Sequence, residues 1–548
     1  MNGSEILINV LLEQDVDTVF GYPGGQVVNI YDALYKYSDK ITHVLTAHEQ
    51  GAAHAADGYA RASGKCGVVI ATSGPGATNL VTGIANAYLD SVPMVAVTGN
   101  VPNFLIGRDS FQEVDIAGIT MPIVKHGFIV KSIDELADTL REAFRIAISG
   151  RTGPVLVDIP KDVQTAEIKY IPAEKVKKSK MRKPSATLIN QAAKLIEKSK
   201  KPFIYCGGGA IAANAEKEIA ELAEIIDAPI GTSMMGLTAV SADNPNMLGM
   251  TGMHGRYAAT KAKGDSDLII ALGARFSDRA INSRFKMNKK TKIIHVDIDN
   301  AEIDKNVTSN IGINADVKDT LNAIIPLLPK KNNPEWRDEI KMLKTEQAKT
   351  EASKLYPREI VECIRKYAKD NTPIVTDVGQ HQMWTAQYYK FKNPRTFISS
   401  GGLGAMGFGV GGAIGAAMAT GRKTVLITGD GSFGMDMNEL ATVGTHNIPL
   451  IILIMNNGAL GMVRQMQTMF FDGHYSQTTL HRKTDFVKLA DAFGIKAKRI
   501  LNESELEPII KKAFMQNEPF VIDCKIDIND RVLPMIPPNG TFDDLIIR

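Results

Sequence analysis

The stretch TVLITGDGSFGMDMNELATVGTHNIPLIILIMNN, residues 424–457, contains the parts of one parallel β-α-β unit: an apolar strand, a Gly-Asp-Gly turn, a helix, a proline and a second apolar strand. The stretch GVVIATSGPGATNLVTGIANAYLDSVPMVAVTGN, residues 67–100, has the same parts in the same order. Many β-α-β units share this order of strand, glycine turn, helix and proline, but these two flank a separate middle segment. Together they predict a duplicated fold whose ligands bind at the carboxyl ends of the strands.

Two charged, proline-containing stretches with little apolar periodicity, 165–190 and 328–354, divide the chain into three segments. In each segment short Val/Ile-rich runs alternate with helical patterns, which is typical of parallel sheets covered by helices on both faces. We therefore predict an α/β fold of three doubly wound parallel-sheet domains, the first and third alike and the middle one Rossmann-like. The predicted domains are 1–175, 190–330 and 355–548.

The composition is that of an ordinary globular protein of 548 residues, with 44% hydrophobic and 22% charged residues. A formal net charge of +3 and the lack of a basic stripe argue against a nucleic-acid partner. The four cysteines have no C-x-x-C spacing, so neither a zinc site nor a disulfide framework is expected. No targeting signal or apolar run of membrane-spanning length is visible, and we expect a cytoplasmic protein without a membrane partner.

Two oxygen-bearing side chains follow the two strands of the 424–457 unit. Asp430 comes directly after the first strand and Asn457 after the second, 27 positions later (457 − 430). If these strands are neighbours, both side chains reach one point and suit Mg²⁺, which keeps other coordination positions for phosphate and water. Gly429 and Gly431 let backbone N–H groups approach a phosphate at the start of the following helix. Asp-Gly is also a common turn, so the pairing with Asn-Asn carries the prediction.

A Gly-Asp-Gly followed some thirty residues later by Asn-Asn resembles the thiamine diphosphate (ThDP) motif. The wider chain, from about residue 4 to the C-terminal VLPMIPP, resembles the large catalytic subunits of the acetolactate synthase (acetohydroxyacid synthase) family. The stretches that carry this resemblance are GYPGG, HEQGAAHAADGYAR, TSGPGATN, FQEVDIAG, GPVLVDIPKDV, GMHG, GARFSDR, VGQHQMW, GGLGAMGFG and GMV.

Glu49 stands in the Ala- and Gly-rich run TAHEQGAAHAADGYAR, residues 46–61. On these residues alone it is an acid at a helix start, where the backbone dipole favours it. The resemblance implies a catalytic role, in which the carboxylate hydrogen-bonds N1′ of the ThDP aminopyrimidine and promotes deprotonation of C2. We expect the small neighbours to desolvate Glu49 and raise its affinity for the shared proton.

The resemblance also implies the other ThDP contacts. In similar enzymes the first domain of one chain holds the aminopyrimidine and the third domain of another chain holds the diphosphate. The implied ThDP-binding residues are Pro75, Asn79, Val378, Gly379, Gln380, His381, Gly404, Met406, Gly429, Asp430, Gly431, Ser432, Asn457, Gly461 and Met462, with Met406 supporting the bent cofactor and Asp430, Asn457 and Ala459 binding the metal.

In the middle segment, YCGGGAIAAN (205–214) has the strand, glycines and helix of a dinucleotide-binding turn, a weak signal alone. With GMHG, GARFSDR and HVDIDN it resembles the FAD-binding loops of the biosynthetic family members, where FAD is mainly structural. The implied FAD-binding residues are Arg151, Gly207, Gly208, Gly209, Thr232, Met253, His254, Gly273, Arg275, Asp297, Ile298, Asp316 and Val317.

The resemblance assigns a second set of residues to the substrates. Arg279, with Asp278 beside it, would bind the carboxylate of the second 2-ketoacid, for which a planar guanidinium is suited. Phe111 and Gln112 would line the reacting carbonyl, and Lys161 the mouth of the channel. Met466 stands where most biosynthetic relatives have Trp, so we expect a weaker preference for 2-ketobutyrate and resistance to sulfonylureas.

The resemblance implies an acetolactate synthase. Such an enzyme decarboxylates pyruvate on ThDP and condenses the hydroxyethyl carbanion with pyruvate or 2-ketobutyrate, giving 2-acetolactate or 2-aceto-2-hydroxybutyrate, as in valine and isoleucine biosynthesis. The alternatives are another ThDP/FAD enzyme such as a pyruvate oxidase, or a catalytically silent homologue. The implied assembly is a homodimer or tetramer with active sites at the dimer interface. The sequence leaves open whether a small regulatory subunit binds.

Overall fold

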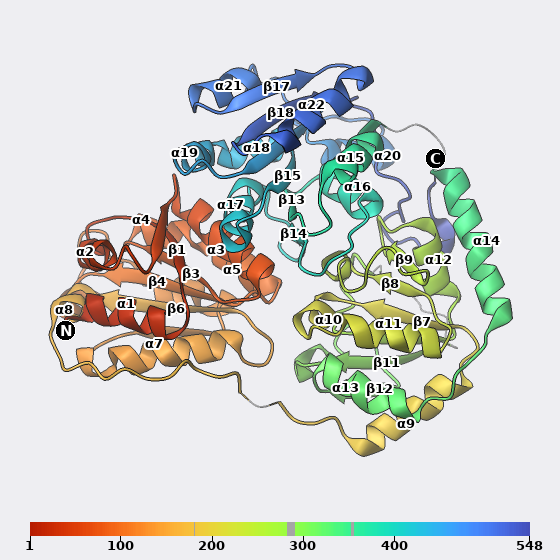
Figure 1. The fold of residues 1–548 in the computed structure, drawn as a ribbon, viewed down its shortest axis with the longest axis horizontal. Helices are drawn as coiled ribbons and strands as arrows, with labels where there is room; N and C mark the ends of the chain where they lie inside the picture. The colour runs from red at the N-terminus through yellow and green to blue at the C-terminus, as the bar shows by residue number, and fades with distance from the viewer. Residues whose placement is uncertain (180, 282–290, 352–355, 548) are drawn as a thin grey trace.

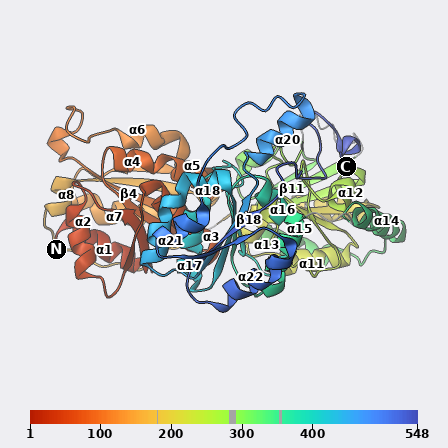
Figure 2. The same cartoon turned by 90° about the horizontal axis from the view of Figure 1, so that it is seen from above.

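The computed structural model describes residues 1–179, 181–281, 291–351 and 356–547. It contains three six-stranded sheets whose paired strands are all parallel. Figure 1 shows the first domain at the left, the middle domain at the lower right and the third domain at the top. Seen from above in Figure 2, the third domain overlies the region between the other two. The prediction of three parallel α/β domains is confirmed.

The first and third sheets have the same topology. Their strand orders are β2-β1-β3-β4-β6-β5 and β14-β13-β15-β16-β18-β17, which become identical when each sheet is numbered from its own first strand. The predicted likeness of the two domains is therefore confirmed. The strands of the first sheet are β1 (Thr18–Tyr22), β2 (Thr42–Leu45), β3 (Gly67–Ala71), β4 (Met94–Asn100), β5 (His126–Ile129) and β6 (Pro154–Pro160). Those of the third are β13 (Ile374–Thr376), β14 (Phe397–Ser399), β15 (Thr424–Gly429), β16 (Leu450–Asn456), β17 (Lys496–Ile500) and β18 (Phe520–Lys525).

Helices cover both faces of these two sheets. The first domain contains α1 (Gly3–Glu13), α2 (Val28–Lys36), α3 (Glu49–Ser63), α4 (Pro75–Asn79), α5 (Val81–Leu89), α6 (Ile116–Thr120), α7 (Ile133–Ile148) and α8 (Lys161–Thr165). The third contains α15 (Tyr356–Tyr367), α16 (Gln380–Tyr388), α17 (Gly409–Thr420), α18 (Asp430–Asp436), α19 (Leu440–Thr445), α20 (Gly461–Phe470), α21 (Phe486–Ala492) and α22 (Glu503–Met515).

The middle sheet has the order β12-β11-β10-β7-β8-β9. Numbered within the domain and taken from the other edge, this order is 3-2-1-4-5-6, the order of a dinucleotide-binding Rossmann sheet. The Rossmann-like prediction is confirmed. Its strands are β7 (Pro202–Cys206), β8 (Ile230–Thr232), β9 (Met247–Met250), β10 (Leu268–Leu272), β11 (Lys292–Asp297) and β12 (Ile311–Asn314), and its helices include α9 (Ala186–Lys198), α10 (Gly208–Ala212), α11 (Glu216–Ile225), α12 (Tyr257–Asp265) and α13 (Val317–Ile324).

The Ala- and Gly-rich face of α3 packs directly against α17 of the third domain (Figure 1). A Cβ on Gly58 would collide with the carbonyl oxygen of Gly412, and one on Gly415 would collide with that of Ala55. At these two positions even the methyl group of alanine would hold the helix backbones apart. The small residues of 46–61 serve this contact between domains, which joins both domains in one buried core.

One predicted linker is wrong in part. The stretch 328–354 contains helix α14 (Pro334–Thr350), which packs against α12 along the edge of the middle domain (Figure 1), while its last residues, 352–354, lie outside the described residues. This helix has few apolar residues, and two of them, Trp336 (1% exposed) and Ile340, are buried and hold it against the domain. In the other linker, residues 168–179 and 181–185 contain no helix or strand. The exact domain limits stay a prediction.

Candidate active site

Asp430 and Asn457 follow two strands that the structure places side by side. β15 pairs with β16 in parallel register, Gly429 opposite Met455, so the carboxyl ends of both strands lie at one edge. Asp430 begins α18, and burial raises the pKa of its carboxyl to about 6 against the opposing effect of backbone N–H groups. A buried carboxylate at the point where Asn457 follows the end of β16 is a suitable site for a divalent cation.

The donor set limits how that cation could be held. In the part of the chain that is described, no cluster of three or more His, Cys, Asp or Glu side chains could hold a metal by itself. The oxygens of Asp430 and Asn457 fit Mg²⁺ only if a phosphate and water complete the shell, which is the usual arrangement for this ion in phosphate sites. The residues therefore fit a magnesium–diphosphate ligand better than a free magnesium ion.

A buried amide network holds Asn457, and sequence reasoning missed its third member, Gln465. Asn457 Nδ2 donates to Gln380 Oε1 (3.3 Å), and Gln380 Nε2 donates to Gln465 Oε1 (3.1 Å) and to the carbonyl of Asp530 (2.8 Å). Gln465 in turn contacts the backbone of Val532 through both ends of its amide. The C-terminal segment thus supports the predicted cofactor loop and α20 together.

Backbone and carboxylate contacts shape the other cofactor loops. Ser432 Oγ donates to the carbonyl of Val378 (2.7 Å), which ties the Gly-Asp-Gly turn to the loop before α16. Asp377, fully buried and missed by sequence reasoning, accepts from the N–H groups of Val378 (2.8 Å) and Gly407 (3.0 Å). It thereby fixes the loop that carries Gly404 and Met406.

His381 provides an observation that favours a diphosphate here. Its Nε2 is buried and has no hydrogen-bond partner among the described residues. A Cβ on Gly429 would lie 3.0 Å from His381 Nδ1, so a larger residue at the turn would press against the ring. A phosphate oxygen would satisfy such an orphaned group.

Glu49 is the first residue of α3, and the structure joins it to another predicted pyrimidine-side residue. Asn79 Nδ2 donates to Glu49 Oε2 (3.0 Å). A Cβ on Gly76 would lie 3.1 Å from Glu49 Oε1, so this glycine leaves space beside the second oxygen. Pro75, the first residue of α4, is exposed.

The expectation that small neighbours desolvate Glu49 is not met in the single chain, where the residue is half-buried. The physical reason is that the Ala- and Gly-rich residues of α3 pack against α17, whereas the Glu49 side chain contacts Asn79 outside that packing. Glu49 also begins its helix at the N-cap His48, whose Nδ1 accepts from the N–H of Gln50 (3.1 Å).

The predicted substrate residues lie mostly at the surface of this chain. Phe111 is 84% exposed and Gln112 adopts a positive φ of 60° in the same loop. The side chain of Arg279 is 72% exposed and pairs with Asp278 at 3.6 Å. Lys161 Nζ donates to the carbonyl of Gly25 (3.2 Å).

Met466 is half-buried on α20. Within the described ranges, no hydrogen bond or ion pair connects the substrate set to Glu49 or Asp430.

Two of the three glycines of 207–209 are required by the protein itself. A Cβ on Gly207 would collide with the carbonyl of Gly273, and one on Gly209 would lie 2.7 Å from the Gly273 Cα. Gly273 has a φ of +57°, which favours glycine there too. Two of the three glycines that predicted a dinucleotide-binding turn are therefore explained first by close backbone packing. Of the three, only Gly208 does not pack closely against Gly273.

Orphaned polar groups nevertheless fit a ligand on the middle domain. Thr232 Oγ1, at the end of β8, and His254 Nδ1 are buried without hydrogen-bond partners among the described residues. Burial raises the pKa of Asp297, at the end of β11, to about 6. These groups lie at the carboxyl ends of Rossmann strands or in the predicted FAD loops, as a dinucleotide ligand would require.

The remaining predicted FAD residues have other partners. Arg151 pairs with Glu302 (2.6 Å) and Asp299 (3.3 Å), so it links the first and middle domains. Arg275 donates to the carbonyl of Leu89 (2.6 Å). Asp316 caps α13 and is followed by the buried Val317, while Met253 and Ile298 are half-buried.

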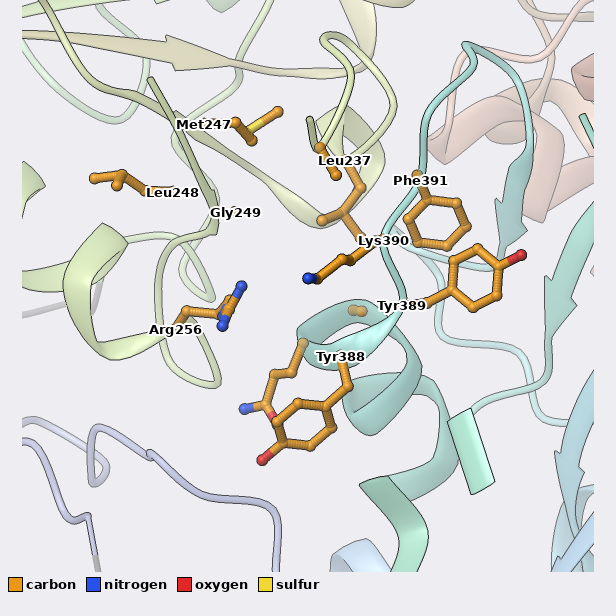
Figure 3. A pocket seen from close by; sticks show the side chains of 12 residues that line it. Leu237, Met247, Leu248, Gly249, Arg256, Tyr388, Tyr389, Lys390 and Phe391 are labelled. Carbon is orange, nitrogen blue, oxygen red and sulfur yellow. The ribbon is translucent and has the colours of Figure 1, made fainter. Parts of the chain in front are cut away.

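A cavity of about 70 Å³ lies elsewhere, between β9 and the end of α16 (Figure 3). Figure 3 shows Arg256 and Lys390 on opposite walls, with Tyr388 below them. Arg256 is already paired with Glu351 (2.9 Å), and none of the predicted site residues lines the cavity. It is separate from the candidate active site.

No helix among the residues described has the length and apolar character needed to cross a bilayer.

Comparisons with known proteins agree with this geometry. The chain matches three family descriptions: "Thiamine pyrophosphate enzyme, N-terminal TPP binding domain" over residues 1–119, "central domain" over 189–324 and "C-terminal TPP binding domain" over 377–524. It is similar to the "probable acetolactate synthase large subunit" of Methanocaldococcus jannaschii, with 45% identity over 100% of this chain and 95% of that protein.

Two bacterial relatives are similar over comparable lengths. The "acetolactate synthase large subunit" of Corynebacterium glutamicum is 44% identical, over 100% of this chain and 90% of that protein. The "acetolactate synthase isozyme 3 large subunit" of Escherichia coli K12 is 40% identical, over 100% and 98%.

Proposed function

The chain belongs to the thiamine pyrophosphate (ThDP) enzymes, among the acetolactate synthase large subunits, and from this premise we propose how its residues carry out that activity. An acetolactate synthase joins two 2-ketoacids: pyruvate loses CO₂, and the remaining two-carbon unit forms a carbon–carbon bond to the carbonyl carbon of the second ketoacid. With two pyruvates the products are 2-acetolactate and CO₂; with 2-ketobutyrate as acceptor, 2-aceto-2-hydroxybutyrate replaces 2-acetolactate.

The observation that carries the proposal is the pair of strand-end sites on two domains of one topology. ThDP, when bound, supplies the electron sink for decarboxylation. Glu49 would share a proton with N1′ of the aminopyrimidine through Oε1, because Asn79 already occupies Oε2. In this arrangement Asn79 orients the Glu49 carboxylate through Oε2, and Oε1 stays available to the cofactor.

The diphosphate and metal would be held by the third domain. We propose that Asp430, Asn457 and the carbonyl of Ala459 bind Mg²⁺, and that the orphaned His381 Nε2 and the turn at Gly429 meet the phosphates. Asn457 Oδ1 accepts from the N–H of Ala459 (3.1 Å), a contact that keeps the side chain at the strand end.

FAD is proposed for the middle domain with a mainly structural role. The orphaned Thr232 and His254, and Asp297 at a strand end, support it. The glycines 207 and 209 no longer count as support, because packing against Gly273 explains them.

The assembly is proposed to be a homodimer or tetramer with each active site shared between two chains. Phe111 and Arg279 of the predicted substrate set are largely exposed in the single chain, which supports an interface between copies. The relatives are named large subunits, and on that basis we propose a small regulatory partner. The free thiols of the cysteines support a reducing, cytoplasmic location.

The test is to incubate the purified protein with pyruvate, ThDP and Mg²⁺ and to measure acetolactate, acetaldehyde and hydrogen peroxide. Acetolactate as the main product is expected. Peroxide would identify a flavin-linked oxidase, acetaldehyde a simple decarboxylase, and no product a silent homologue. Glu49→Gln serves as the matched inactive control, because it keeps the size of the side chain and removes the shared-proton chemistry.

A further inference from the structure

A third-domain carboxylate reaches the backbone directly before Glu49. Glu439 ends the short 3₁₀ helix η6 (Met437–Glu439) and is 0% exposed. Its Oε2 accepts from the N–H of Ala47 (3.1 Å) and its Oε1 from the N–H of His48 (3.0 Å). The residues joined in this way are 392 and 391 positions apart in the sequence.

Gly51 has no side chain, which leaves room for the Glu439 carboxylate. A Cβ on Gly51 would collide with Glu439 Oε1 and lie 2.5 Å from Cδ. The glycine lies in the first turn of α3, where alanine would otherwise be the better helix former. Its presence is explained by the approach of Glu439.

Glu439 is one of several contacts between the two domains. The close packing of α3 on α17 and the hydrogen bonds from the N–H groups of Gly401 and Gly402 to Asp90 also join them. The third donor to Glu439, Thr442 Oγ1 (2.6 Å), lies within its own domain and orients the carboxylate. Both contacts across the domain boundary are therefore made to the two residues that precede Glu49.

We propose that Glu439 is a positioning residue, which clamps Ala47 and His48 and so sets the direction from which Glu49 meets the aminopyrimidine. This inference rests on the role proposed for Glu49. The clamp holds the backbone of the two residues before Glu49, while Asn79 holds the Glu49 carboxylate. Hydrogen bonds to an ionised carboxylate are about twice as strong as neutral ones, which suits a fixed element.

The first test uses the full chain without cofactor. Hydrogen exchange of the Ala47 and His48 amides is measured in the wild type, in Glu439→Gln and in Gly51→Ala. In Glu439→Gln the side-chain amide can accept only one of the two bonds, and in Gly51→Ala the added methyl group displaces the carboxylate. At least one backbone amide should therefore exchange about 10-fold faster in each variant. Equal protection in all three proteins would overturn the clamp.

The second test asks whether the clamp matters for catalysis. Exchange of the C2 proton of bound ThDP and the kcat of turnover should fall about 10–100-fold in both variants, with less than about 3-fold change in KM for pyruvate, as for a misplaced catalytic group. Because Gly51→Ala raises helix propensity, a loss of helix stability cannot explain such a fall. Ala62→Gly, at the far end of α3, is the matched control that weakens the helix without touching the clamp.

The double variant Gly51→Ala/Glu439→Gln separates the outcomes further. If the methyl group acts by displacing the carboxylate, the second change adds less than about 2-fold to the loss. Faster amide exchange with wild-type C2 exchange would overturn the positioning role, and so would an equal loss in Ala62→Gly. If Glu49→Gln itself exchanges C2 like the wild type, the role of Glu49 fails, and the amide data still decide the clamp.

Discussion

Lys263, a buried lysine in the middle domain, is expected to lower that domain's stability, and replacing it by methionine should raise it. The side chain lies on the inner face of α12 and is 1% exposed. Its Nζ is 3.8 Å from the centroid of the Tyr205 ring and 3.4 Å from the carbonyl oxygen of Ala280. In the described portion of the chain no carboxylate pairs with it. Burial accordingly lowers the pKa of Lys263 from its ordinary 10.5 to about 7.

The pKa difference fixes both the size and the sign of the effect. The unfolded chain binds this proton more tightly than the folded chain, so the penalty on folding is complete below pH 7, decreases as pH rises, and vanishes above pH 10.5. At about 1.4 kcal/mol per tenfold change in proton affinity, the penalty is about 5 kcal/mol at low pH and about 4 kcal/mol at pH 7.5. Methionine leaves the Ala280 carbonyl without its donor, which costs about 1 kcal/mol. The net gain at pH 7.5 is therefore about 3 kcal/mol.

Urea unfolding can follow the middle domain alone, because the chain has two tryptophans and Trp336 packs in that domain with its Nε1 donating to the Pro202 carbonyl (3.0 Å). In a Trp384→Phe background, Trp336 emission reports α14 and its contact with α12. The midpoint should rise by about 1–3 M at pH 7.5 for Lys263→Met, and the gain should nearly disappear at pH 9.5. Lys261→Met, on the same helix but paired with the exposed Asp543, is the control and should change little. A gain that is absent at pH 7.5, or equal at both pH values, would refute the reasoning.

Four shorter predictions concern the active site. Glu49→Gln should nearly abolish turnover while leaving the thermal unfolding temperature unchanged; wild-type exchange of the ThDP C2 proton would contradict it. Asp430→Ala should weaken Mg²⁺ and ThDP binding together, since one ion bridges protein and diphosphate, and calorimetry showing unchanged affinity would remove that role. Purified protein should bind FAD, and Thr232→Val should weaken flavin binding in a fluorescence titration if its orphaned hydroxyl meets the ligand; equal affinity would exclude that contact. Met466→Trp should raise the preference for 2-ketobutyrate over pyruvate, by about 10–200-fold at most, and increase sulfonylurea sensitivity; a competition assay without either gain would show that the position acts differently here.

The fold class and the strand-end sites were accessible from the sequence because they depend on local patterns. Val/Ile-rich runs of strand length, interrupted by glycine turns and helical periodicity, allow few arrangements other than parallel sheets. Asp430 and Asn457 could be placed at one edge of a sheet because each directly follows a strand, and the pairing of β15 with β16 agrees with that placement. The duplication of the first and third domains was likewise visible in the sequence, because residues 67–100 and 424–457 share one order of strand, glycine turn, helix and proline.

Other features depended on which elements lie next to each other, and only the tertiary structure decided them. Nothing near residue 439 indicates that its carboxylate reaches Ala47 and His48, because the partners are almost 400 positions away. The glycines of 207–209 looked like a ligand signal, yet close packing against Gly273 accounts for two of them.

The same holds for Lys263 and Glu49. In the sequence, Lys263 is one of four charged residues at every second position from 261 to 267, and only the packing of α12 against Tyr205 buries it. Glu49 stands among small residues that suggest burial, but those residues face α17, and Glu49 itself is only half-buried. A local pattern determines which elements form and which side chains stand at their ends. The environment of each side chain is set by long-range packing, which is where its burial, its hydrogen-bond partners and its pKa are decided.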